Sequence, residues 1–175
     1  MRVYVPGVHD SKQVRVFEVQ CVPIVEPSLD IVTGNVNNEI YDSCFVALTL
    51  LRTNKLLPEN QRFHIHFTDS ELLKSGPSAG LGVFLKLLSM DVKSDMNLIV
   101  TGELDLSGNV IEVGGFYEKL EYYCKNSLNF DGFIVPTSNF KDIEDKLFCD
   151  KLEPISHISE IRGVLNEIIT DNIHN

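Results

Sequence analysis

The sequence has no tryptophan, four cysteines and no long apolar run. Its longest dense apolar stretch is residues 44–51, whereas a helix that crosses a membrane needs about 20 apolar residues. The first residues include Pro6, Asp10 and Lys12, so they contain no apolar core of a signal peptide. We therefore expect no membrane-spanning segment. The cysteines form no Cys-x-x-Cys pair, which predicts reduced thiols in a cytoplasmic protein.

Basic residues are scarce: 15 lysines and arginines face 25 aspartates and glutamates, giving a net charge of −10. A surface of this sign repels phosphate groups, which argues against nucleic acid and anionic membrane as partners. The 43% apolar and 23% charged content is that of a globular protein. A chain of 175 residues is long enough to bury a core without metal or disulfides, so we expect one domain over residues 1–175.

Hydrophobic periodicity predicts alternating strands and helices. The expected strands are residues 14–25, 29–33, 62–67, 97–101 and 132–135, with a hairpin at 103–113. The expected helices are residues 39–51, 78–90, 116–126, 137–147 and 158–169, the last capped by Ser156 or Ser159. The irregular order of these elements predicts an α+β fold of layered mixed sheets and helices.

Ser78 is the first candidate for chemistry, because it stands in Gly-Pro-Ser-Ala-Gly between a predicted loop and a predicted helix. The start of a helix presents unpaired N–H groups and a positive dipole end. A serine oxygen there can attack a carbonyl while the amides of Ser78 and Ala79 stabilise the oxyanion. The alternative is a plain N-cap serine. A phosphate-binding loop is disfavoured because no Gly-Lys-Ser/Thr follows.

Lys119 is the second candidate. The predicted helix surrounds it with Phe116, Tyr122 and Tyr123. Burial without a carboxylate partner lowers the pKa of a lysine from about 10.4 and allows the neutral amine to act as a general base. The alternative is an ordinary solvated lysine on a helix surface.

Taken together, three segments resemble the proteolytic domain of the Lon proteases. They are Gly76-Pro77-Ser78-Ala79-Gly80, Thr101-Gly102-Glu103 and Gly114-Gly115-Phe116-Tyr117-Glu118-Lys119. The family places its serine in a P-S-A-G segment and its lysine in a G-G-x-x-E-K segment, in this order and at similar spacing. Residues 64–67, 32–34 and 134–136 also match family segments, so that the resemblance runs from about residue 14 to 169.

The resemblance implies a serine–lysine dyad. Ser78 would be the nucleophile, Lys119 the general base and acid, and Thr101 would hold the lysine amine towards Ser78. His64, His66 and Glu103 would have supporting roles near the site. Alternatively, the two histidines lie on one strand face as surface or interface residues. No metal or other cofactor is expected, since two histidines at i and i+2 lack a third ligand.

This sequence departs from the family in two ways. Ser75 stands where the family commonly has an acidic residue, and no ATPase module or Walker-type glycine loop is present. We therefore expect an ATP-independent serine endopeptidase that cleaves unfolded proteins or peptides. The resemblance also implies a homo-oligomer, with a hexameric ring as in the family. The alternatives are a catalytically silent Lon-like assembly or binding module, and the protease subunit of a two-component machine with a separate ATPase.

Overall fold

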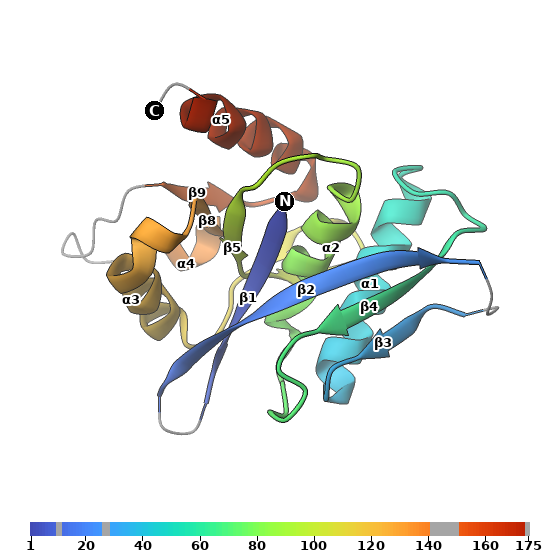
Figure 1. Ribbon diagram of the computed structural model, residues 1–175, viewed down its shortest axis with the longest axis horizontal. Coiled ribbons are helices and arrows are strands. Elements are labelled where there is room, and N and C mark those ends of the chain that lie inside the picture. The colour runs from blue at the N-terminus through green and yellow to red at the C-terminus, as the bar shows by residue number, and fades with distance from the viewer. Residues whose placement is uncertain (10–11, 26–28, 141–150, 174–175) are drawn as a thin grey trace.

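The computed structural model describes residues 1–9, 12–25, 29–140 and 151–173 (Figure 1). Its strands are β1 Arg2–Val8, β2 Val14–Ile24, β3 Ile31–Thr33, β4 Arg62–Phe67, β5 Asn97–Val100, β6 Glu103–Leu104, β7 Val110–Ile111, β8 Gly132–Pro136 and β9 Leu152–Ile155. The α-helices are α1 Asn38–Thr53, α2 Gly80–Leu88, α3 Phe116–Asn126, α4 Thr137–Phe140 and α5 Ile161–Ile173, with 3₁₀ turns η1 Pro77–Ala79, η2 Ser127–Asn129 and η3 Ile158–Glu160. The expected α+β fold class is confirmed.

Seven strands form one mixed sheet in the order β3-β4-β2-β1-β5-β8-β9. β1, β2 and β4 pair antiparallel, whereas β3–β4, β1–β5, β5–β8 and β8–β9 pair parallel. β6 and β7 make a separate hairpin. The carboxyl end of β5 leads directly into that hairpin, and ligand sites in open sheets with parallel strands commonly lie at such ends.

Helices cover both faces of the sheet. In Figure 1, β2 and β4 pass in front of α1 and α2, and α3 stands apart from them to the left of β1. Side chains of α1, α2 and α5 share one apolar core, which includes Leu51, Leu85 and Ile168. A second core joins α3 to β5 and β8 through residues such as Leu120 and Phe133. The sheet thus separates two packed layers.

The structure differs from the expected elements at several places. The helix expected at residues 78–90 is the 3₁₀ turn η1 followed by α2, and the last helix is likewise preceded by η3. That last segment is capped by His157, whose side chain accepts from the Ser159 N–H, and not by Ser156 or Ser159. α4 covers the first part of the helix expected at 137–147, and the rest lies outside the described residues.

The cysteines also differ from the expectation of uniformly reduced thiols. Cys21 and Cys44 are free, and burial raises the pKa of the Cys21 thiol to about 12. Cys124 is disulfide-bonded, so the prediction of reduced thiols is wrong for this residue. Cys149 lies outside the described residues. Among the helices that the structure describes, none combines the length and apolar character that a bilayer crossing requires.

Candidate active site

Ser78 lies in the 3₁₀ turn η1, directly before α2. The N-cap of this turn is Gly76, whose φ of +94° is a conformation that favours glycine. Ser78 is therefore inside the turn and does not act as an N-cap. Its carbonyl oxygen accepts from the Gly102 N–H at 2.9 Å, and the Leu81 N–H donates to the Gly102 carbonyl at 3.0 Å. These two bonds fasten the serine to the segment after β5.

Lys119 reaches Ser78 from α3, on the other face of the sheet. Its Nζ lies 3.3 Å from Ser78 Oγ and 3.3 Å from Thr101 Oγ1. Only 3% of Lys119 is exposed, because α3 packs it against the second core. The alternative of a solvated helix lysine is therefore wrong. The two residues of the implied dyad and the threonine implied to hold the lysine amine therefore lie together.

Burial lowers the pKa of Lys119 to about 8, and the neighbouring Glu118 carboxylate opposes this shift. The cause is desolvation, which disfavours the charged ammonium. A substantial fraction of the amine is then neutral at mildly alkaline pH. A neutral amine within hydrogen-bonding distance of a serine hydroxyl is the arrangement that general-base activation requires.

Thr101 and Gly102 directly follow β5, and each contacts one residue of the dyad: Thr101 contacts Lys119, and Gly102 contacts Ser78. Thr101 is fully buried, and its N–H donates to the Ile134 carbonyl in the neighbouring strand β8. A Cβ atom at Gly102 would lie 2.9 Å from side-chain atoms of both Leu81 and Val110. The absence of a side chain therefore permits the close contact between this segment and the Ser78 turn.

A cleft of about 360 Å³ opens over the dyad. It is lined by Gly7, Val8, Ser75, Gly76, Pro77, Ser78, Glu103, Glu112, Val113, Gly114, Gly115 and Lys119. Glu103 thus lines the same cleft as Ser78 and Lys119. The structure adds Glu112, which the sequence offered no signal to select because it is one of many exposed glutamates. The two glutamates give the cleft a negative wall.

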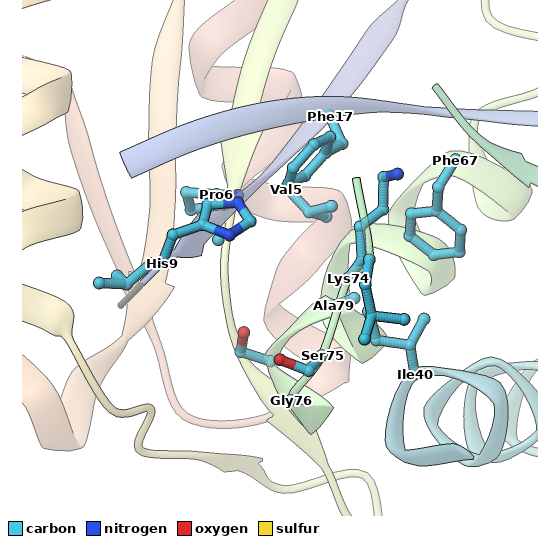
Figure 2. A pocket seen from close by; sticks show the side chains of 14 residues that line it. Val5, Pro6, His9, Phe17, Ile40, Phe67, Lys74, Ser75, Gly76 and Ala79 are labelled. Carbon is cyan, nitrogen blue, oxygen red and sulfur yellow. The ribbon is translucent and has the colours of Figure 1, made fainter. Parts of the chain in front are cut away.

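A smaller, largely apolar cavity of about 40 Å³ adjoins Ser78 on the side of the first core (Figure 2). Its apolar lining includes Val5, Phe17, Ile40, Phe67 and Leu73. Ser75 and Gly76 also line it, and the side chain of Lys74 forms another part of the wall (Figure 2). Sequence reasoning did not select Lys74.

The two histidines lie elsewhere on the sheet. His64 Nε2 and His66 Nδ1 each lie 2.8 Å from Thr33 Oγ1, which is on the adjacent strand β3. Neither ring is among the groups that line the cleft or the apolar cavity. Both rings therefore contact β3, and the supporting role near Ser78 and the alternative of surface or interface residues both stay predictions. Within the described residues, no three His, Cys, Asp or Glu side chains are grouped to hold a metal ion.

Known proteins share this sequence pattern. A family model described as the Lon protease (S16) C-terminal proteolytic domain matches residues 14–171. The Lon protease of Aster yellows witches'-broom phytoplasma is 32% identical over an alignment of 145 residues, and that alignment covers 75% of this chain and 18% of that protein. The mitochondrial Lon protease homolog of Emericella nidulans is 34% identical over 136 residues, 73% of this chain and 12% of that protein.

The mitochondrial Lon protease homolog of Drosophila melanogaster is 32% identical over 123 residues, 65% of this chain and 12% of that protein. The chain therefore spans less than a fifth of the length of these three relatives. The family model, by contrast, covers most of the chain, and its matched range includes Ser78, Thr101 and Lys119. The chain belongs to the family of Lon protease (S16) C-terminal proteolytic domains.

Proposed function

We propose that this protein is a serine endopeptidase in which Ser78 and Lys119 form the catalytic dyad. The observation that carries the proposal is the 3.3 Å contact between Lys119 Nζ and Ser78 Oγ, made by a lysine that burial keeps partly neutral. Membership of a proteolytic-domain family supports the same reaction.

In the proposed reaction, neutral Lys119 takes the Ser78 proton and the serine oxygen bonds to the peptide carbonyl carbon. The backbone amides of Ser78 and Ala79 stabilise the oxyanion; Pro77 has no N–H to contribute. The C–N bond then breaks as the Lys119 ammonium protonates the leaving amine. Lys119 then takes a proton from water as the water oxygen attacks the acyl carbon. The bond between that carbon and Ser78 Oγ breaks, and the Lys119 ammonium returns the proton to Ser78. Thr101 accepts from the amine throughout and keeps it directed at the serine.

The proposed substrates are peptides and unfolded protein segments, because the reacting carbonyl must enter a cleft of about 360 Å³ between Ser78 and Lys119. These steps consume water alone, so we propose that the dyad cleaves such substrates without ATP. A homo-oligomer, a hexameric ring and a separate ATPase partner stay predictions.

The test is digestion of a fluorescently labelled unfolded protein by wild type, Ser78→Ala and Lys119→Met. Lys125→Met is the matched control, since Lys125 lies on the same helix but is exposed and paired with Glu121. We expect cleavage by wild type and the control, and a loss of at least 1,000-fold in the two dyad variants. Circular dichroism checks that all four are folded. Cleavage that survives in Ser78→Ala would overturn the assignment.

The second candidate is a silent Lon-like assembly or binding module, and the contact of Lys119 with Ser78 argues against it. A fluorophosphonate probe distinguishes the two. Covalent labelling of wild type, absent in Ser78→Ala, supports the peptidase. Folded wild type that neither reacts with the probe nor cleaves supports the module. Labelling together with cleavage of folded substrates only after addition of an ATPase and ATP supports the two-component machine.

A further inference from the structure

Lys74 is a buried cation that the proposed reaction does not use. It is 3% exposed, although it stands in the loop that joins β4 to η1, the turn that contains Ser78. Burial lowers its pKa, and the Asp69 charge opposes this shift. A buried ammonium is costly unless its protons are hydrogen-bonded. The groups that the Lys74 ammonium binds therefore indicate which part of the structure it stabilises.

The Lys74 ammonium is bound by three backbone carbonyls and one ring. Nζ donates to the carbonyl oxygens of Gly34 at 2.8 Å, Asp69 at 2.5 Å and Leu72 at 2.9 Å. It also lies 4.6 Å from the centre of the Phe17 ring, within the range of a cation–π contact. Figure 2 shows the side chain running away from Gly76, with its nitrogen towards Phe17. All three ammonium protons thus have acceptors.

These contacts join the loop to the turn after β3. Gly34 belongs to that turn, whereas Asp69 and Leu72 belong to the loop itself. The Lys74 backbone makes the same connection, because its N–H donates to Asn35 at 2.9 Å and its carbonyl accepts from Asn37 at 3.0 Å. A Cβ at Gly34 would lie 2.2 Å from the Phe67 carbonyl oxygen, so the turn sits directly on β4. The loop is therefore fixed to the sheet at Lys74.

This anchor is close to the reacting serine. Gly76, the N-cap of the Ser78 turn, follows Lys74 by two residues, and Lys74 and Ser78 line the same apolar cavity. Ser78 must lie within hydrogen-bonding reach of Lys119, which is held by a different core. A displacement of about 1 Å between reacting groups can cost about 100-fold in rate.

We propose that Lys74 is a positioning residue: its ammonium closes the 69–76 loop onto the Gly34 turn and thereby sets the distance between Ser78 and Lys119. The proposal rests on the Ser78–Lys119 reaction proposed above. Removal of the ammonium, with an apolar side chain of similar length retained, would lower the rate of serine acylation while leaving the lysine base buried and active.

The test compares Lys74→Met with Lys86→Met. Lys86 is a matched control because its Nζ also donates to a backbone carbonyl, that of Met1 at 2.9 Å, but it lies on α2 and lines neither cavity at the site. The measurements are kcat and KM on a fluorogenic peptide from pH 6 to 10, the rate of fluorophosphonate labelling, and thermal unfolding. We expect kcat and the labelling rate to fall at least 10-fold in Lys74→Met and less than twofold in Lys86→Met.

The pH profile distinguishes a positioning role of Lys74 from a general loosening of the fold. In Lys74→Met we expect the plateau of kcat at high pH to fall. The midpoint of the profile should stay at the wild-type value, since Lys119 remains buried. Rates within twofold of the Lys86→Met control overturn the proposal, as does a midpoint that moves towards about 10.4, the pKa of an exposed lysine. If Lys74→Met does not fold, Lys74→Gln is compared with Lys86→Gln. The shorter amide has two N–H donors and cannot satisfy all three carbonyls, so we still expect a larger fall in kcat than in Lys86→Gln. Wild type that neither cleaves nor labels refutes the dyad itself, which is a separate result.

Discussion

Lys119 is 3% exposed, and among the described residues no carboxylate forms an ion pair with its amine. Under the proposed mechanism, this burial serves catalysis at the expense of stability. Burial lowers the pKa of Lys119 from the ordinary value of 10.5 to about 8 in the folded protein. Under the proposed mechanism this shift sets the pH range of activity, and it also makes folding depend on pH.

Activity should rise with pH as Lys119 loses its proton. In the proposed mechanism the neutral amine is the base, so kcat/KM is expected to increase about tenfold per pH unit below the pKa and to level off above a midpoint near 8. The measurement is kcat/KM on an uncharged peptide from pH 6 to 10. A rate that is flat over this range contradicts the lysine base.

The same residue should make Lys119→Met more stable than wild type at neutral pH. Because the folded pKa is depressed, the unfolded chain binds more protons between pH 8 and 10.5, and wild-type stability rises with pH through that window. The full shift corresponds to about 3 kcal/mol. Urea unfolding should show a gain for Lys119→Met at pH 7 that shrinks by pH 10, whereas Lys125→Met should show no such trend.

Glu39 should hold the Ser78 turn from the side of α1. Its Oε2 accepts from the Gly76 N–H at 2.9 Å and from Asn37 Nδ2 at 3.0 Å. Because Glu39 is exposed, its loss should reduce kcat only a few-fold and leave folding intact. Glu39→Ala is therefore expected to be slower than Glu39→Gln, which keeps an acceptor, when kcat is compared with that of Asp42→Ala on the same helix. Equal rates for the Ala and Gln variants contradict this role.

At the level of elements, the segment after β5 joins the two layers of the site. Gly102→Ala would place a methyl group 2.9 Å from Leu81 and Val110, and overpacking of this kind costs about 1–3 kcal/mol. We expect a lower melting temperature together with a loss of cleavage well beyond what stability explains, because Ser78 is bonded to Gly102. Gly163→Ala is the control, since a Cβ there meets no atom within 4 Å.

Sequence periodicity predicted the elements whose own pattern is strong. The strand at 62–67 and the helix at 116–126 agree with β4 and α3 at both ends. The expectations omitted β1 and β9, which contain Pro6 and Pro154. Proline argues against a strand, yet β1 is held by β2 on one side and β5 on the other. Tertiary pairing, which a local pattern does not contain, overrode the local signal.

The candidate site was predictable only where its residues lie in short, distinctive sequence segments. Ser78, Thr101 and Lys119 stand in short segments with a distinctive order, and the structure brings them together. The histidines also stand in a matching segment, but a strand face fixes only which way a side chain points. It does not fix the distance to another element, and both rings contact Thr33. The burial of Lys74 had no local signal, because its acceptors are backbone carbonyls.

For the whole molecule, charge should select among substrates. The net charge is −10, and Glu103 and Glu112 line the cleft. A field of this sign attracts cationic segments, and salt screens it. We expect kcat/KM for a lysine-containing peptide to exceed that for its glutamate-containing counterpart at low salt, with the ratio falling towards one in about 0.5 M NaCl. Glu112→Gln should reduce the ratio, and an unchanged ratio across salt concentrations contradicts the prediction.

Ser78 and Lys119 are 41 residues apart and reach the site from helices on opposite faces of the sheet. During synthesis, the ribosome releases the serine well before the lysine, and a lysine in an unfolded chain is protonated at neutral pH. Under the proposed mechanism, a nascent chain therefore has no nucleophile that could attack its neighbours. In that mechanism, proteolytic activity arises only after the helices on both faces have packed against the sheet. The order of synthesis and folding would therefore determine when the dyad becomes active.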